Sequence, residues 1–489
     1  MLFNSASFIF LYVPIVLAGA FLLARTRPQW AIGWLGLSSF AFYAVWDWRF
    51  LPLLLASILG NYLTGLRILT ARDRSQGAAK AWLTVGVTAN LVLLGVFKYA
   101  GFFAATGATL LGAPKPDLGI VLPLGISFFT FTQIAFLVDA YRGEVRSRRA
   151  DSYALFVSYF PHLIAGPILH HGEMIPQFER KGAFRFDWEN IAIGLTIFAI
   201  GLFKKVILAD EMAPLVKPAF DAAAAGQAVT PDLAWLAALA YTLQLYFDFS
   251  GYSDMAIGLS RMLGVQLPVN FNSPYKATSA IDFWRRWHMT LSRFLRDYLY
   301  FPLGGNRLGP RRRYLNLMAV MLLGGLWHGA GWTFVVWGSL HGLYLVVNHL
   351  WRSRMGARRM PVALARLLTF LGVLIAWVVF RANDLPAALR LWSAMLGQGP
   401  GGVATGWSEW ASCLLLLGIA WFAPNTQQIL RAYRPGLGSE EAGLPGRPGA
   451  AIAWRPGLFT ALVVGALLAA PLYFVVFTDR VSDFLYFRF

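Results

Sequence analysis

Two of the seven histidines lie in sequence surroundings that favour chemistry over packing. His328 belongs to the motif LWHGAGW, in an apolar stretch from Tyr314 to Leu340 that holds no charged residue. His288 belongs to the segment DFWRRWHMTLSRF, where arginines stand among aromatic residues. An ionisable side chain deep in an apolar run is costly, so it is by default a functional candidate. Both imidazoles are therefore candidates for catalysis.

Acyl transfer is the chemistry that these residues fit best. A neutral imidazole can take the proton of an acceptor hydroxyl while the hydroxyl oxygen attacks an activated acyl group. A thioester is activated already, so one base and one hydrogen-bond donor to the oxyanion suffice. Indole, guanidinium and glycine N–H groups could all serve as that donor, and the sequence does not choose among them. The competing interpretation is a structural histidine that bonds two helices together.

Other kinds of site have less support. The sequence contains no GxSxG, HExxH or P-loop motif. Its one cysteine, Cys413, excludes a disulfide within the chain and a cysteine-rich metal site, and we interpret it as a small buried hydrophobic residue. No His-x-His or carboxylate–His spacing surrounds His328, so we expect no metal ion there.

A second polar group lies in the segment QLYFDFSGYSDMAIGL, which contains Tyr246, Asp248 and Asp254. Two carboxylates in an apolar helix are expensive. They could line a cavity, cap a helix break, or pair with arginines of the segment 282–300. Lys204 and Lys205 could also neutralise them, or could extend toward the membrane surface. We favour a structural pairing.

The composition places these residues in a membrane. Of 489 residues, 57% are hydrophobic and 13% are charged, whereas a soluble domain carries about 25% charged residues. Recurrent long apolar runs predict an all-α, polytopic integral membrane protein with about 11–12 transmembrane helices. We treat residues 1–489 as one membrane domain, with N-terminal helices at 1–110, a core motif region at 120–351 and C-terminal helices at 360–489. The predicted spans are 7–24, 31–46, 50–68, 81–106, 120–140, 190–209, 232–262, 314–329, 332–351, 364–380, 409–424 and 457–477.

Basic residues in the loops predict the orientation. The loops after the first, third and fifth predicted spans hold ten Arg and Lys residues, and the alternate loops hold two. Basic loops stay in the cytoplasm, so the N-terminus should be extracytoplasmic. The loop 351–360, which includes Arg358 and Arg359, and the linker 425–456 are then cytoplasmic, and the terminal FLYFRF is outside. This rule accounts for the net charge of +18 without nucleic acid as a partner, and the same residues could attract an anionic donor.

Two segments do not fit simple spans. Residues 152–168 contain two prolines and a glycine, which predict a broken or re-entrant segment with His162 as a polar cap of the break. His170 and His171 follow in a polar loop, where we expect them to be solvated. Residues 282–300 show helical spacing of apolar and basic residues, which predicts an amphipathic helix at the cytoplasmic interface.

His328 should lie inside the bilayer. Arginines flank the apolar run 314–351 at both ends, which predicts a hairpin with both ends in the cytoplasm. From Tyr314, a helix rises about 22 Å to His328, less than the hydrocarbon thickness of about 30 Å. We therefore predict a cavity that meets His328 from the outer side, the inner side, or both. We interpret His341 as a packing or supporting residue and His349 as interfacial.

The chain resembles the membrane-bound O-acyltransferase superfamily, and its bacterial alginate and polysaccharide O-acetyltransferase branch in particular. The resemblance rests on LPLGISFFTFTQIAFLVDAYRGE (122–144), FPHLIAGPI (160–168), QLYFDFSGYSDMAIGLSRMLG (244–264), DFWRRWHMTLSRFLRDYLYFPLGGNR (282–307), GGLWHGAGWTFVVWGSLHG (324–342) and FLYFRF. It implies a ring of helices around a thin centre, with a funnel that reaches a catalytic histidine. That histidine maps onto His328, and a second required histidine on the cytoplasmic side maps onto His288.

The resemblance also implies the substrates. The donor would be an acyl thioester, acetyl-CoA here, with no permanently bound cofactor. The acceptor would be alginate, cellulose, peptidoglycan, another exopolysaccharide or a serine of a partner protein, in a bacterial inner membrane with periplasmic partner acyltransferases and membrane lipids nearby. The residues that we expect to contact substrate or donor are Arg285, Arg286, Trp287, Arg296, Asp297, Tyr298, Trp327 and Asp248.

Two other functions compete with acyl transfer. One is a transporter or flippase for a lipid-linked sugar with His328 as a proton relay; the absence of recognisable inverted repeats in the sequence argues against it. The other is a non-catalytic membrane anchor for a periplasmic enzyme.

Overall fold

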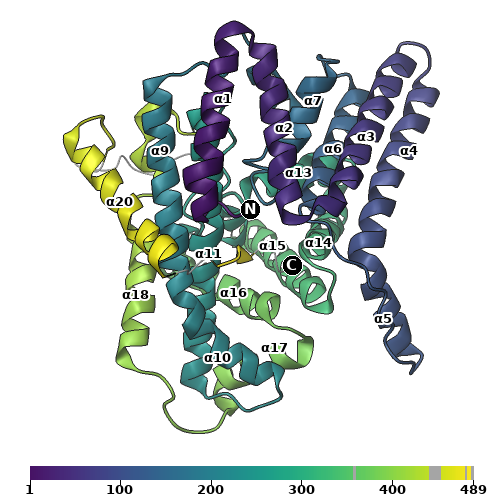
Figure 1. Cartoon of the computed structure of the whole chain (residues 1–489). Helices are drawn as coiled ribbons and strands as arrows, with labels where there is room; N and C mark the ends of the chain where they lie inside the picture. Colours follow the sequence, from purple (N-terminus) through teal and green to yellow (C-terminus); the bar gives the residue numbers. More distant parts are fainter. Residues whose placement is uncertain (356–359, 440–452, 479–481, 486–489) are drawn as a thin grey trace.

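The computed structural model describes residues 1–355, 360–439, 453–478 and 482–485, and within these ranges the chain is helical and forms no strand (Figure 1). This confirms the predicted all-α class. Arg358, Arg359, residues 440–452 of the linker 425–456 and the last four residues of FLYFRF lie outside the described residues.

Helices occupy all twelve predicted spans. In chain order they are η1 (Phe8–Tyr12) with α1 (Val13–Thr26), α2 (Pro28–Asp47), α3 (Leu51–Arg72), α4 (Gln76–Leu94) with η3 (Gly95–Tyr99) and α5 (Ala100–Leu110), α6 (Ile126–Arg142), α9 (Trp188–Phe203) with η4 (Lys204–Ala209), α11 (Pro231–Met262), α14 (Gly309–His328), α15 (Trp332–Met355), α16 (Val362–Arg381), α18 (Trp407–Phe422) and α20 (Leu458–Phe477). Within the described residues, six helical stretches are long and apolar enough to cross a membrane by length and composition alone.

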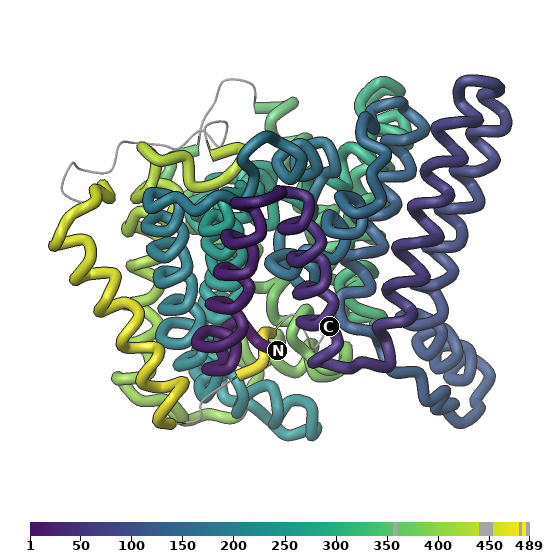
Figure 2. The backbone as a smooth tube through the Cα atoms, turned by 45° about the horizontal axis from the view of Figure 1, so that its top comes forward, coloured from purple at the N-terminus to yellow at the C-terminus, as the bar shows by residue number. Residues whose placement is uncertain are grey.

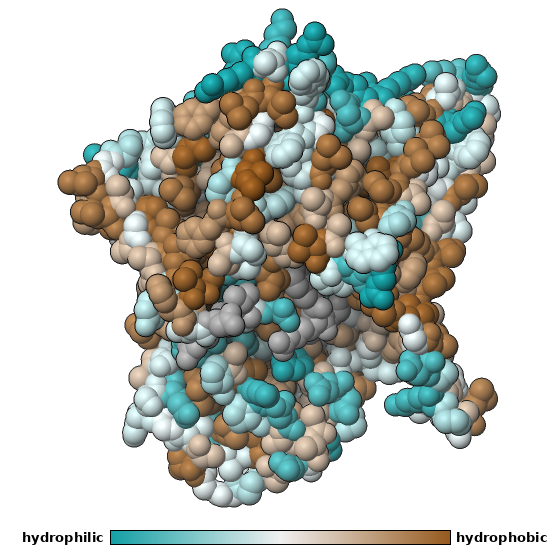
Figure 3. Space-filling model, viewed as in Figure 1, coloured by the Kyte–Doolittle hydropathy of each residue, from teal (hydrophilic) through white to brown (hydrophobic). Residues whose placement is uncertain are grey.

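The helices differ in how they run through the molecule. In Figure 1, α1, α3, α4 and α9 run between the top and the bottom of the view. In contrast, α14, α15 and α16 are inclined toward the viewer, so that they appear foreshortened, and lie near mid-height. Hydrophilic residues gather at the top of the molecule, around the α1–α2 turn, and on the lower lobe that contains α10 (Ala213–Ala224) and α17 (Leu385–Ser393), with an apolar belt between them (Figure 3). The inclined helices are therefore at the level of the apolar belt.

The N-terminus lies near the middle of the molecule (Figures 1 and 2), and the described residues 482–485 pack beside it. The Asn4 side-chain amide donates to the Ser482 carbonyl oxygen over 3.2 Å. Phe3 and Phe484 are each 2% exposed and both pack against the Tyr252 ring of α11. The two ends thus join the core beside the longest helix.

Helices α9 and α11 are pressed together at glycines seven residues apart on each helix. A Cβ atom added to Gly194 would lie 2.6 Å from the carbonyl oxygen of Gly258, and one added to Gly258 would lie 2.5 Å from that of Gly194. Gly201 and Gly251 face each other in the same way, at 2.6 and 2.7 Å. Small residues let two membrane helices approach this closely.

We expect Gly258→Leu to separate α9 from α11 and to lower the free energy of unfolding by about 1–3 kcal/mol or more, because an overpacked contact forces the backbone to shift. Thermal unfolding of the detergent-purified protein measures the effect. Gly60→Leu is the matched control, because a Cβ at this exposed position of α3 meets nothing within 4 Å. Equal melting temperatures for the two variants would contradict the packing argument.

The segment 152–168 is broken as predicted. Helix α7 (Ala150–Ser158) ends before Pro161 and the chain continues as a buried turn. His162 is 1% exposed and its Nε2 lies 2.8 Å from the Phe156 carbonyl oxygen, which confirms its interpretation as a satisfied polar group at the break.

The prediction of one amphipathic surface helix over 282–300 is wrong. The chain forms three short pieces there, α12 (Ala280–Trp284), α13 (Met289–Leu295) and η7 (Arg296–Tyr300). Phe283, Trp287 and Leu291 are each at most 2% exposed, so the apolar face packs into the protein core rather than onto the membrane. Helical spacing reveals the apolar face but not whether lipid or protein covers it.

Candidate active site

His328 is the last residue of α14, at the tip of a tight helical hairpin. The chain turns at Gly329 and enters α15 three residues later. A Cβ on Gly325 would lie 2.3 Å from the Phe334 carbonyl oxygen, and one on Gly338 would lie 2.4 Å from that of Met321. Only glycine permits this approach. The two glycines therefore fix where the hairpin ends and where His328 is held.

Aromatic side chains enclose the His328 ring, which is 4% exposed. Trp337 of α15 and Phe380 of α16 meet it edge to face, with centroids 4.9 and 5.4 Å away. Trp327 lies 5.0 Å away in the same manner. His341 does not join this set. Its ring packs against Trp337 at 4.7 Å, in agreement with its predicted supporting role.

His288 lies in the break between α12 and α13. Its backbone is left-handed, with φ 42°, a conformation that a bulky residue adopts at a cost. The imidazole is fully buried, and its Nδ1 lies 3.1 Å from Asn270 Oδ1. The same oxygen accepts the Thr290 hydroxyl at 2.9 Å and the Thr290 backbone N–H at 3.3 Å.

Asn270 therefore sets the state of the His288 ring. The Thr290 N–H donates to this atom, which identifies it as the amide oxygen, and an amide oxygen only accepts, so Nδ1 of His288 must carry the proton and donate. In the neutral ring Nε2 is then the acceptor nitrogen. Asn270 lies 18 residues from His288 in sequence, in the extended stretch after α11.

The structure brings the two imidazoles together, with ring centroids 6.4 Å apart. That spacing is too long for a direct hydrogen bond between the rings. The Phe249 ring meets His288 edge to face at 4.9 Å and the Trp327 ring lies 6.0 Å from it, so apolar surfaces line the space around the pair.

Trp287 and Trp327, two of the predicted substrate-contacting residues, border this pair. Trp327 lies beside both histidines, and the Trp287 ring packs 5.0 Å from Trp377. Arg285 is exposed, and Arg286 forms an ion pair with Asp282 over 2.8 Å.

The other predicted contacts lie in different clusters. Arg296 and Asp297 pair with each other over 2.7 Å at the surface. The Tyr298 hydroxyl donates to Asp139 over 2.8 Å. Asp248 pairs with Lys205 over 2.8 Å. The structure therefore gathers only part of the predicted set around the histidine pair.

The expectation that His170 and His171 are solvated is wrong. His171 is 6% exposed and its Nδ1 lies 3.2 Å from Asp139 Oδ2. His170 Nδ1 lies 3.1 Å from the Tyr298 hydroxyl. The Asp139 carboxylate of α6 thus pairs with His171 directly and is connected to His170 through the Tyr298 hydroxyl. The sequence around the two histidines does not reveal this partner.

The buried aspartates of α11 pair with lysines, not with arginines. Asp248 Oδ1 lies 2.8 Å from Lys205 Nζ, and Asp254 Oδ2 lies 2.6 Å from Lys204 Nζ. Lys205 also reaches the Ser482 hydroxyl at 2.7 Å, and Asp248 accepts the Leu485 backbone N–H at 3.1 Å. This pair therefore anchors the described C-terminal residues to the core.

We expect Lys205→Met to destabilise the protein by about 3–5 kcal/mol, because it leaves the Asp248 carboxylate buried without its cation. Thermal unfolding and the amount of protein in the membrane measure this loss. Asp248→Asn added to Lys205→Met should restore part of it. The exposed Lys217 of α10 supplies the control Lys217→Met. A Lys205→Met protein as stable as this control would refute the anchoring role.

A cleft of 410 Å³ reaches the residues next to His328. Gly329, Ala330 and Phe334 form one wall, and Lys98 of η3 and the loop residues 116–120 form the others. The cleft lies on the side of the hairpin tip, opposite the arginine-flanked ends of α14 and α15. It stops at Gly329 and does not include the His328 ring among its lining residues, so a cavity that meets the ring itself stays a prediction.

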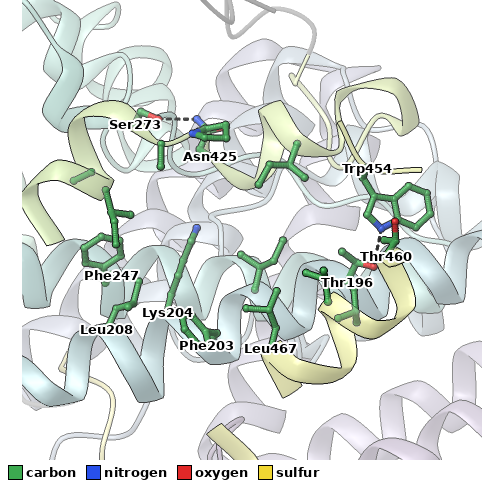
Figure 4. Close-up of a pocket in the computed structure, with 18 of the residues that line it drawn as sticks. Thr196, Phe203, Lys204, Leu208, Phe247, Ser273, Asn425, Trp454, Thr460 and Leu467 are labelled. Carbon is green, nitrogen blue, oxygen red and sulfur yellow. Dashed lines mark hydrogen bonds between the residues drawn. The ribbon is translucent and has the colours of Figure 1, made fainter. Parts of the chain in front are cut away.

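A second, mostly apolar cavity of 490 Å³ lies between α9, α11, α18 and α20 (Figure 4). Lys204 extends along it toward Ser273 and Asn425, which are bonded to each other over 2.9 Å. Neither His288 nor His328 lines this cavity. It is separate from the histidine pair.

Comparison with known proteins agrees with this arrangement. Residues 139–383 match the model of the MBOAT, membrane-bound O-acyltransferase family, and both histidines fall inside the match. The chain is 45% identical to a peptidoglycan O-acetyltransferase of Helicobacter pylori over 81% of its own length and 80% of the relative's. It is 44% identical to a probable alginate O-acetylase of Azotobacter vinelandii over 82% and 79%.

A more distant relative is a teichoic acid D-alanyltransferase of Streptococcus thermophilus, 27% identical over 54% of this chain and 69% of the relative. The relatives thus differ in acyl group and in polymer. The helical fold, the family match and the identity to two O-acetyltransferases lead to one conclusion: this chain belongs to the membrane-bound O-acyltransferase family and is an O-acyltransferase of its alginate and peptidoglycan O-acetylation branch.

Proposed function

We propose that the protein moves an acetyl group from a cytoplasmic thioester, acetyl-CoA, across the bacterial inner membrane to a hydroxyl group on the extracytoplasmic side. The acceptor is a polysaccharide such as alginate or peptidoglycan, reached directly or through a periplasmic partner protein. The observation that carries the proposal is the pair of buried imidazoles 6.4 Å apart at the tip of the α14–α15 hairpin.

His328 is the base in this proposal. Its imidazole takes the proton from the acceptor hydroxyl as the oxygen attacks the thioester carbonyl carbon. The tetrahedral intermediate collapses, the carbon–sulfur bond breaks, and the same proton passes to the departing thiolate. The products are an acetyl ester and free coenzyme A thiol, so atoms and charge balance without a further reactant.

His288 lies on the donor side. Asn270 accepts its Nδ1–H, so Nε2 is the nitrogen of the neutral ring that can take a proton during transfer. Trp337 is the candidate donor to the oxyanion. Its ring lies 4.9 Å from His328, and its buried Nε1 has no hydrogen-bond partner among the described residues. A preorganised N–H in a site without water stabilises developing negative charge strongly.

The two substrates approach from opposite sides. The basic loops and the arginines near α12 suit an anionic coenzyme A thioester from the cytoplasm. The cleft beside Gly329 suits a hydroxyl-bearing acceptor from the other side, because Lys98 and Asp117 line it and Gly329 adjoins His328 in the chain. The family relationship supports an enzyme, so neither a transporter nor a passive anchor has an observation in its favour.

Purified protein in proteoliposomes tests the proposal. Radiolabelled acetyl-CoA is supplied on the cytoplasmic face, and alginate or peptidoglycan fragments are supplied on the other face, with and without a partner acetyltransferase. We expect labelled acetyl esters on the acceptor and one free thiol for each ester formed. An intact thioester under all these conditions, with every candidate acceptor present, would contradict the proposal.

A further inference from the structure

The end of α14 that carries His328 has an unusual arrangement of hydrogen bonds. The last four carbonyl oxygens of any α-helix have no partner within the helix. A helix often solves this with a left-handed glycine after its last residue. Gly329 is instead extended, with φ −160° and ψ 151°, because the chain must enter α15 at once. Most of the hydrogen-bond donors for these four carbonyl oxygens must therefore come from other parts of the chain.

Two residues of η3 supply them. Lys98 Nζ donates to the Trp327 carbonyl oxygen at 2.5 Å and to that of His328 at 3.3 Å. The Tyr99 hydroxyl donates to the Leu326 carbonyl oxygen at 2.7 Å. Only the Gly325 oxygen is bonded from within the hairpin, by the Gly329 N–H at 3.4 Å. All four carbonyls at the end of α14 are thus accounted for.

The local geometry of η3 makes this possible. Residues Gly95–Tyr99 form a π-helical turn between α4 and α5, and such single wide turns occur often at functional sites. The turn directs two consecutive side chains at one helix end. The third donor of Lys98 goes to the Ser127 hydroxyl at 3.1 Å, which ties the same ammonium to α6. An ammonium group at a helix C-terminus also complements the helix dipole.

All three hydrogens of the Lys98 ammonium are therefore committed to protein acceptors. Lys98 lines the cleft beside Gly329, but an ammonium occupied in this way is poorly placed to bind a substrate. Its contacts suit it to hold the backbone of the residue whose side chain does the chemistry. A displacement of about 1 Å at a catalytic group can cost on the order of a hundredfold in rate.

We propose that Lys98, assisted by Tyr99, is a positioning residue for acyl transfer: it clamps the end of α14 so that the His328 ring stays in reach of the substrate and of His288. This inference rests on the proposed role of His328. Lys98 and His328 are 230 residues apart in sequence, so the clamp joins the N-terminal helices to the core motif region.

The test compares Lys98→Met, Lys98→Arg and Tyr99→Phe in the purified full chain. We expect Lys98→Met to lower kcat for acetyl transfer at least about tenfold, with KM for acetyl-CoA within twofold of the original protein. Lys98→Arg keeps the charge and the donors and should retain most of kcat. Tyr99→Phe, which removes one hydrogen bond, should lower kcat by a smaller factor. Lys115→Met is the control, because Lys115 is an exposed lysine in the loop beside the same cleft.

A second measurement does not depend on acyl transfer. Diethyl pyrocarbonate modifies imidazole rings, and mass spectrometry reports the rate at His328 in each variant. We expect a faster reaction at His328 in Lys98→Met than in Lys115→Met, because the released helix end exposes the ring. Absence of acetyl transfer by the original protein would refute the proposed function alone, and the modification rates would still decide the clamp.

Unchanged kcat and an unchanged His328 modification rate in Lys98→Met would overturn the clamp. So would a raised KM with kcat intact, because that pattern indicates a substrate-binding lysine. If Lys98→Met does not accumulate in the membrane, Tyr99→Phe decides: a kcat equal to that of the original protein overturns the proposal.

Discussion

His328→Ala should lower acetyl transfer by about a hundredfold to ten-thousandfold, the range that a positioned general base contributes. The acceptor hydroxyl would then have to lose its proton to water, which the aromatic enclosure around His328 excludes. Acetyl esters formed by proteoliposomes, and the acetyl content of the polymer made by cells that carry the variant, measure the loss. The protein should still accumulate in the membrane, because the fold of the hairpin depends on Gly325 and Gly338.

His349→Ala is the matched control. His349 lies on α15, toward the end of the same hairpin that is away from its tip, and is partly exposed. We expect its acetyl transfer to stay within twofold of that of the original protein. Normal acetylation in His328→Ala would remove His328 from the mechanism, and so would equal losses in the two variants.

His288→Gly should lower acetyl transfer by about tenfold to a hundredfold, because it removes the ring to which we assign the donor side. Glycine is the appropriate replacement because the backbone at this position has φ 42°, which glycine adopts without strain and alanine does not. The measurement is kcat and KM for acetyl-CoA. A role on the donor side predicts that KM rises together with the fall in kcat.

Arg434→Gly controls for the backbone. Arg434 also has a left-handed conformation, with φ 46°, in a surface turn distant in sequence from both histidines. We expect full activity in Arg434→Gly. Full activity in His288→Gly as well would show that the imidazole of His288 has no part in transfer.

Much of the fold could be predicted because each membrane helix is a local feature. A long apolar run identifies a helix regardless of its neighbours, so all twelve predicted positions are helical. His328 was recognisable for a related reason, because the apolar stretch around it, from Tyr314 to Leu340, holds no charged residue. The end of its helix could be predicted as well, because glycines follow it closely.

The parts that were missed depend on contacts between distant segments. The segment 282–300 has helical spacing, but the core that breaks and covers it is formed by other helices. Asn270, which sets the ring of His288, comes from a stretch without a motif. Lys98 did carry a signal, because it is a charged residue inside the predicted span 81–106. Its partners, the carbonyl oxygens of α14, have no sequence signature.

The hydrogen bond between Asn4 and Ser482 constrains how the protein is made. The two residues are 478 positions apart, so the bond can form only after the ribosome and the insertion machinery have delivered nearly every helix. Phe484 packs against Phe249, which in turn touches His288. The packing around His288 is therefore completed late in biogenesis, and a nascent chain that stops before α20 carries both histidines without the Phe484 ring that supports Phe249.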